Sequence, residues 1–198
     1  MKKITLTILL LVMVCYAQCL SGPLSTRVGI KAGFNPGTYE PDDTLGNMKG
    51  TGVHFGLGMG TDLFNLIALD MGAQFRTTTY SREEALGRVT HSYNNLYFPI
   101  FLSIKAGMWP LISPYLGAGI GINVQFEGKR RWEPNGVAVE TDLAGATNAY
   151  FILGLGAEIK FIKLRVCPEF TANIKPNSED QDDKYTDLHF SVGLFYAP

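Results

Sequence analysis

The chain has 198 residues, of which 12% are aromatic, with 22 glycines and a formal net charge of -1. This length suits one domain, and the balanced charge offers no basic excess of the kind that nucleic-acid binding needs. We therefore expect a single domain and no nucleic-acid partner.

The N-terminus has the parts of a secretory signal peptide. Lys2 and Lys3 carry positive charge, an unbroken apolar run follows, and polar and small residues come after it. We expect 1–17 to be removed, or a slightly longer segment that ends at about residue 25. Residues 26–198 then form the mature domain.

Two other interpretations of this segment fit less well. A transmembrane helix needs roughly 20 apolar residues, more than this run provides. A lipoprotein signal ending at Cys19 would need Gly, Ala or Ser where Gln18 stands. Cleavage leaves at most Cys19 and Cys167, one in a terminal segment and one in a predicted strand, so we expect no structural disulfide.

Beyond the N-terminus, apolar residues alternate with small or polar ones. In the first such segment the apolar positions include Val28, Ile30 and Phe34. A period of two is typical of a β-strand with one apolar face. The pattern predicts eight strands, at 28–35, 53–60, 69–76, 96–105, 116–125, 151–160, 164–173 and 188–195.

The links between these strands alternate in length. Short links at 62–65, 107–113 and 161–163 alternate with long ones at 36–51, 79–90, 127–148 and 175–187. Outer-membrane barrels have short periplasmic turns and longer extracellular loops. The sequence therefore predicts an all-β fold, an eight-stranded antiparallel up-and-down transmembrane β-barrel.

Charge separates the two faces of the predicted strands. A charge that faces the middle of the bilayer costs roughly 2 to 4 kcal/mol, so the charged face must point into the barrel. An eight-stranded barrel has room inside only for packed side chains. We expect a lumen filled by a structural charge network of Lys31, Asp70, Arg76, Lys105, Glu158, Lys160, Arg165 and Glu169.

Two prolines, Pro99 and Pro168, lie in the middle of predicted strands. Proline lacks the N–H group that a ladder hydrogen bond requires, so it is typical of a bulge or an edge. We expect each proline to remove one ladder hydrogen bond, as at a bulge or an edge.

Several segments resemble a known family. Residues 28–35 (VGIKAGFN) look like the first strand, 95–105 (NLYFPIFLSIK) like the fourth and 114–121 (PYLGAGIG) like the glycine-rich strand that follows. The family is that of the outer-membrane β-barrel, porin-like proteins common in Bacteroidetes-type bacteria, which are related in architecture to the small OmpX and OmpA barrels. The resemblance covers the whole mature chain and implies a place in the bacterial outer membrane, in contact with its lipid and lipopolysaccharide.

The resemblance also implies how the chain is inserted. Members of such families usually end on an aromatic residue that the barrel-assembly machinery reads, whereas this chain ends Tyr196-Ala197-Pro198. We expect the same machinery to insert it, as a monomer.

Two features could carry chemistry, and each has a simpler interpretation. His189 and Ser191 lie two apart on one strand and resemble the His-x-Ser of a lipid A deacylase, but the alternation places both in the lumen. The three histidines lie on different segments without the spacing of metal ligands. We expect no enzyme activity, no metal and no cofactor.

The longest predicted outer loop contains three consecutive cations beside an aromatic residue: Lys129, Arg130, Arg131 and Trp132. Arginine suits phosphate recognition, so this cluster could contact lipopolysaccharide phosphates or a partner. The alternative is a solvated loop base.

The predicted function is non-enzymatic, either structural or in recognition through the outer loops. Two alternatives stay open. A narrow porin-like channel would need an open lumen. A soluble exported barrel that binds a hydrophobic ligand would need its apolar face inside and its charges outside.

Overall fold

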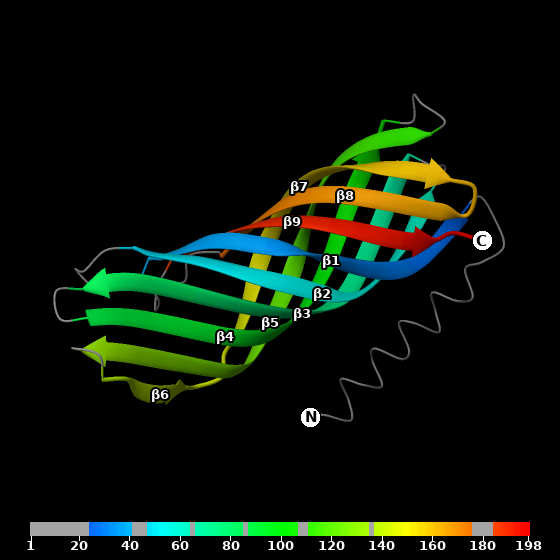
Figure 1. Ribbon diagram of the computed structural model, residues 1–198. Helices are drawn as coiled ribbons and strands as arrows, with labels where there is room; N and C mark the ends of the chain where they lie inside the picture. The colour runs from blue at the N-terminus through cyan, green and yellow to red at the C-terminus, as the bar shows by residue number, and fades with distance from the viewer. Residues whose placement is uncertain are drawn as a thin grey trace.

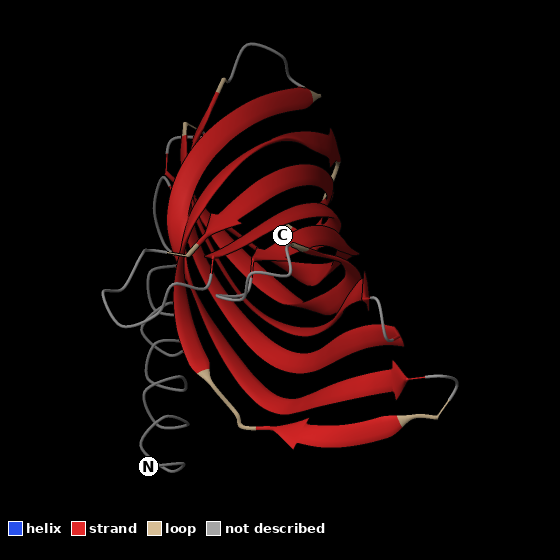
Figure 2. Ribbon diagram, turned by 90° about the vertical axis from the view of Figure 1, so that its left-hand side faces the viewer, coloured by secondary structure: helices blue, strands red, loops and turns tan. Residues whose placement is uncertain are grey.

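A computed structural model describes residues 24–40, 47–63, 66–84, 87–106, 111–134, 137–175 and 184–198. Every regular element in these ranges is a β-strand (Figure 2). The same ranges contain no helix long and apolar enough to cross a membrane. The predicted signal peptide lies outside the described residues.

The described strands form one antiparallel sheet that closes on itself. Neighbours pair in the order β4-β3-β2-β1-β9-β8-β7-β5-β6, and β4 also pairs with β5, which closes a ring of eight strands (Figure 1). The predicted eight-stranded barrel is confirmed, and β6 is an added strand outside the ring. The strands are β1 (Leu24–Glu40), β2 (Met48–Leu63), β3 (Ile67–Glu84), β4 (Gly87–Lys105), β5 (Ile112–Pro134), β6 (Val139–Leu143), β7 (Thr147–Phe161), β8 (Leu164–Ile174) and β9 (Lys184–Tyr196).

The three short links are confirmed and lie at one end of the barrel. β2 is joined to β3 across 64–66, β4 to β5 across 106–111, and β7 to β8 across 162–163. The C-terminus lies at this end as well (Figure 1).

The prediction of long loops at 36–51, 79–90 and 127–148 is wrong over most of their length, because these segments are largely strand. β3 and β4, for example, stay paired as far as Glu84 and Gly87. Apolar alternation marks only the length of strand that faces lipid, whereas backbone pairing continues beyond it with polar side chains. In the fourth predicted loop, residues 176–183 lie outside the described part of the chain.

Both mid-strand prolines lie where pairing is interrupted on one side. The pairing of β4 with β3 has a gap at Phe98 and Pro99 and resumes in the same register, while Pro99 stays opposite Gly121 of β5. The pairing of β8 with β7 has a gap at Cys167 and Pro168 and also resumes in the same register, while Pro168 stays opposite Val192 of β9. A residue without an N–H group is tolerated at such a gap. Each proline thus lies at a gap in the ladder, but neither marks a bulge or an edge, because the register is unchanged across the gap and both strands have a neighbour on each side.

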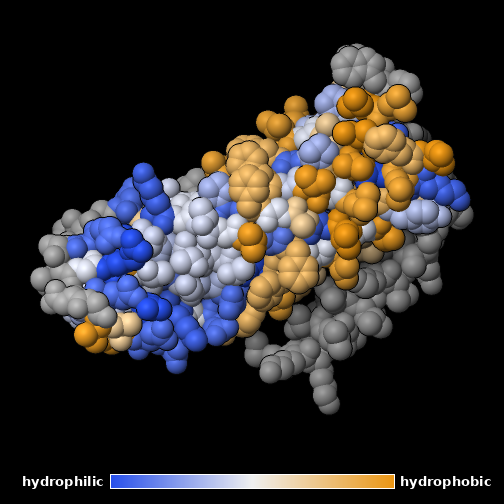
Figure 3. Space-filling view, in the orientation of Figure 1, coloured by the Kyte–Doolittle hydropathy of each residue, from blue (hydrophilic) through white to orange (hydrophobic). Residues whose placement is uncertain are grey.

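The apolar residues of the ring face outward. Leu57 and Leu116 are 66% and 67% exposed, whereas Lys105 is 1% exposed inside the barrel. Figure 3 shows apolar residues gathered toward the end of the barrel that holds the C-terminus, and polar residues over the opposite end. An exposed apolar surface of this kind is typical of a membrane-contacting protein. The soluble alternative is wrong, because it needs the opposite orientation of the two faces.

Candidate functional site

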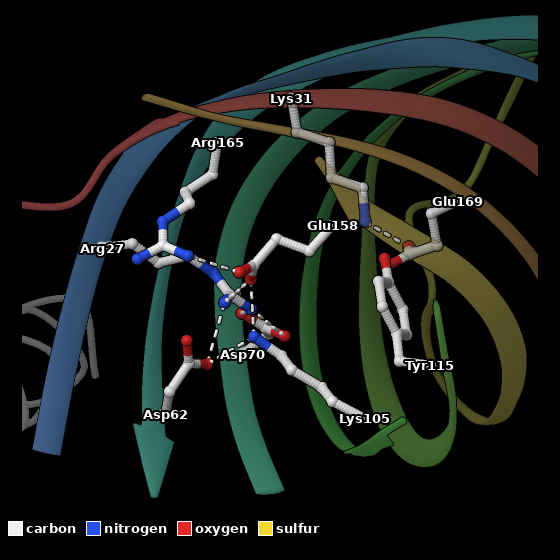
Figure 4. Close-up of polar contacts among 9 residues, drawn as sticks. All are labelled: Arg27, Lys31, Asp62, Asp70, Lys105, Tyr115, Glu158, Arg165 and Glu169. Atoms are coloured by element: carbon white, nitrogen blue, oxygen red, sulfur yellow. Dashed lines mark hydrogen bonds and ion pairs between the residues drawn. The ribbon is translucent and has the colours of Figure 1, made fainter. Parts of the chain in front are cut away.

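A compact group of ion pairs fills the lumen next to the short links. Because side chains alternate across a strand, every second residue of each strand points inward. Six charged residues from six different strands meet in this way (Figure 4). We call this group the ion-pair plug; it consists of Arg27, Asp62, Asp70, Lys105, Glu158 and Arg165.

Glu158 is at the centre of the plug. Its carboxylate accepts hydrogen bonds from Lys105 Nζ at 2.5 Å, Arg27 Nη1 at 2.6 Å and Arg165 Nη1 at 2.7 Å. The side chain of Glu158 is 0% exposed. A buried carboxylate is stable only when cations or hydrogen-bond donors compensate it, and Glu158 has both.

Arg27 and Asp62 complete the plug. Arg27 donates to both carboxylate oxygens of Asp70, at 2.7 and 2.9 Å, and to Asp62 at 2.9 Å. Lys105 also donates to Asp62, at 2.7 Å. The sequence analysis missed Arg27 and Asp62 because it started the first strand at residue 28 and ended the second at residue 60. Extending the same alternation by one inward position would have found both.

A second polar group lies further along the lumen. Lys31 forms an ion pair with Glu169, which also accepts a hydrogen bond from Tyr115 Oη at 3.0 Å. Lys160 lies 3.6 Å from Glu158, at the margin of the plug. Of the predicted lumen charges, only Arg76 lies outside these two groups.

Arg76 packs against an aromatic side chain instead. Its guanidinium carbon lies 3.1 Å from the centroid of the Tyr97 ring, a cation–π contact. Tyr97 is also stacked on His189, with ring centroids 6.4 Å apart. The ring occupies the space above Gly121, where an added Cβ would lie 2.3 Å from Tyr97 Oη. Glycine on the inward face thus makes room for a large neighbour.

The space that remains inside the barrel is small. A cavity of about 50 Å³ lies between the polar groups, lined by residues that include Lys31, His54, Arg76 and Tyr115. A volume of this size holds a few water molecules. Around this cavity the described side chains leave little free space.

The His189 and Ser191 pair lies in the lumen, with both side chains buried. His189 Nε2 lies 2.9 Å from Asn173 Nδ2. Glu158 and Glu169, the acids that could orient a catalytic histidine, are instead held by the cations described above. In the ranges that the structure describes, no group of three or more His, Cys, Asp or Glu residues could hold a metal ion.

Beyond the apolar belt the strands continue as a polar sheet, which we call the outer extension. It consists of residues 36–40 of β1, 48–52 of β2, 77–84 of β3, 87–94 of β4, 127–134 of β5 and all of β6. Its inward face carries a small core of Tyr39, Met48, Tyr80 and Val89. Tyr80 Oη donates a hydrogen bond to Asp187 at 2.7 Å, and burial raises the pKa of Tyr80, which keeps its hydroxyl a donor.

The predicted basic cluster is split between two faces of the outer extension. Trp132 lies opposite Val89, a residue of the inward core, and paired residues share a face. Alternation then places Arg130 on the inward face with Trp132, and Lys129 and Arg131 on the outward face. Both outward cations pair with acids of the same strand. Arg131 Nη2 lies 2.5 Å from Glu133 Oε1, and Lys129 Nζ lies 3.9 Å from Glu127 Oε1.

The sequence matches one protein family along nearly its whole length. The match covers residues 7–198, and the family is described as the outer membrane protein beta-barrel domain. The chain belongs to this family. Membership agrees with the exposed apolar belt and implies a place in the bacterial outer membrane. No curated protein sequence matches the chain.

Several solved structures are similar to this chain. OprG from Pseudomonas aeruginosa has a TM-score of 0.54 and 14% identity, over 89% of this chain and 98% of that one. Neisserial surface protein A has a TM-score of 0.48 and 12% identity, over 85% and 96%. Ail of Yersinia pestis, solved with the heparin analogue sucrose octasulfate, has a TM-score of 0.43 and 12% identity, over 87% and 99%. At such identities the likeness to OprG shows the fold alone.

Proposed function

We propose that this protein is a non-enzymatic outer-membrane barrel with a closed lumen, whose outer extension serves recognition at the cell surface. Signal-peptide cleavage, insertion by the barrel-assembly machinery, the monomeric state and kinship with Bacteroidetes-type barrels are part of the same proposal.

The ion-pair plug is the main observation that supports a closed lumen. Its members connect six strands across the barrel, and both Glu158 and Lys105 are almost entirely buried. A narrow channel needs a continuous aqueous path, and a cavity of about 50 Å³ is far smaller than such a path. The geometry therefore supports a structural and recognition role over transport.

Conductance in planar lipid bilayers tests the closed lumen. We expect the purified protein to insert without current steps, in bilayers where a general porin gives them. The double variant Arg27→Ser/Glu158→Ser shortens two members of the plug, and steps found only in this variant would assign the closure to the plug. Reproducible steps from the unchanged protein would contradict the proposal.

The outward face of the outer extension is the part proposed to contact lipopolysaccharide. Lys129 and Arg131 point to the same side of β5, and basic side chains suit phosphate groups at the membrane surface. Arg130 and Trp132, on the inward face, are not included in this contact.

Binding of purified lipopolysaccharide to the reconstituted protein tests this contact. We expect Lys129→Gln/Arg131→Gln to weaken it, whereas Arg130→Gln removes the cation between them and leaves it unchanged. An equal loss in both variants would mean that net charge, not the outward face, governs binding.

A further inference from the structure

β6 has an open edge. It pairs with β5 on one side and, within the described residues, with no strand on the other. It also lies at the margin of the sheet in Figure 1. Main-chain N–H and C=O groups of a strand point to both of its sides, so some of those in β6 lack a strand partner. Every strand of the ring, by contrast, pairs on both sides.

The open edge lies outside the membrane and beside apolar side chains. Trp132, Val137 and Val139 are 37%, 65% and 49% exposed at the tip of the β5–β6 hairpin. Figure 3 shows a small apolar patch at this otherwise polar end. Trp132 and Val139 lie opposite each other, in a row that continues to the buried Val89 of β4. The apolar row therefore starts in the inward core and ends at the open edge.

The opposite face of the same hairpin carries rows of alternating charge. Arg131 of β5 lies opposite Glu140 of β6, and Lys129 lies opposite Asp142. Arg131 Nη1 is 3.9 Å from Glu140 Oε1, and both side chains are about half exposed. In each of these rows the residue at the open edge is an acid. A basic residue on a further strand would lie opposite this acid and pair with it.

We propose that the edge of β6 binds an extended segment of a partner protein, which joins the sheet as a further strand. Basic residues of this segment lie opposite Glu140 and Asp142, and apolar residues lie opposite Val139 and Leu143. The required pattern, apolar-basic-polar-basic-apolar, reads the same in both directions, so a parallel or an antiparallel strand satisfies it. The proposal rests on the recognition role of the outer extension and names its partner.

A second copy of this chain does not meet these requirements at the edge. If two β6 strands pair antiparallel about Thr141, Glu140 of one copy lies opposite Asp142 of the other. A shift by two residues in either direction sets Glu140 against Glu140, or Asp142 against Asp142. Like charges directly opposite each other destabilise a pair of strands. The acids thus disfavour self-pairing and favour a basic partner.

A pair of fluorescent peptides tests the charge pattern on the full chain in lipid nanodiscs. The core of the first is Val-Lys-Thr-Lys-Val and that of the control is Val-Glu-Thr-Glu-Val. We expect the lysine peptide to bind about tenfold more tightly, as measured by fluorescence anisotropy. Glu140→Lys/Asp142→Lys should reverse this preference, whereas Glu83→Lys/Glu127→Lys, which alters two exposed acids elsewhere on the outer extension, should keep it.

Amide hydrogen exchange tests whether the peptide joins the sheet as a strand. We expect bound lysine peptide to slow exchange within Val139–Leu143. Equal binding of the two peptides, or binding that leaves this exchange unchanged, would overturn the proposal. If the wild type binds neither peptide but still binds lipopolysaccharide through Lys129 and Arg131, the edge proposal alone fails. If it binds the lysine peptide as expected but not lipopolysaccharide, only the lipopolysaccharide contact fails.

Discussion

Glu158 accepts hydrogen bonds from three cations and has no exposed surface, so its negative charge is compensated by protein groups. Its cations would in turn lose their shared anion if the carboxylate were removed. Removing one partner of a buried ion pair lowers the stability of a protein more than replacing the whole pair by apolar residues, because an uncompensated charge is left behind.

Glu158→Gln tests this dependence. We expect it to lower the free energy of unfolding by about 3 kcal/mol, since Lys105, Arg27 and Arg165 lose a charged acceptor inside the barrel. Urea unfolding in lipid vesicles measures the change. Glu83→Gln is the control: it breaks an exposed pair with Arg88 and should cost under about 1 kcal/mol. Equal effects of the two substitutions would show that the plug does not stabilise the barrel.

At this scale the sequence predicted which residues point inward but not how they pair. Parity along each strand assigns Asp70 and Lys105 to the lumen. It cannot show that Arg27 joins Asp70 to Glu158, because these residues are brought together only by the closure of the ring. Arg76 has the same parity as Asp70, yet it packs on Tyr97, a contact that depends on the space left by Gly121.

The strands have two parts with different surroundings. Within the apolar belt, outward residues such as Leu57 and Leu116 are large and apolar. In the outer extension, outward residues are polar although the strands stay paired. The change of outward side chain along one strand marks where the lipid ends.

Leu57→Lys tests which face of β2 meets lipid. We expect it to lower the free energy of unfolding in vesicles by about 2 to 4 kcal/mol, because a charge would face the middle of the bilayer. Thr51→Lys is the matched control on the same face of the same strand, six residues further out, and should cost no more than about 1 kcal/mol. A Leu57→Lys variant as stable as the control would place this face in water.

The eight strands could be predicted because lipid imposes a strict alternation on each one. The full length of the strands could not be predicted, because polar residues are equally stable in water on the outward face of a strand and in a loop. β6 was not predicted for the same reason, because Glu140, Thr141 and Asp142 are as compatible with a polar loop as with a short strand.

The two ends of the barrel differ in structure. The ion-pair plug lies in the lumen near the short links, and the outer extension carries its own small core on the opposite side of the apolar belt. The family and the ring of eight strands establish an outer-membrane barrel. The orientation of its two faces in the bilayer is the physical basis for the proposed closed lumen and for the proposed contacts of the outer extension.

Spin labels at three consecutive positions of β2 test this orientation most directly. Val53 and Phe55 are 58% and 65% exposed, whereas His54 between them is 3% exposed. Each is replaced by a labelled cysteine in a Cys19→Ser/Cys167→Ser background, and the protein is reconstituted in lipid vesicles. Oxygen, which dissolves in the bilayer, should collide often with labels at 53 and 55 and rarely with the label at 54. High oxygen access at 54 with low access at 53 and 55 would contradict a lipid-facing apolar surface.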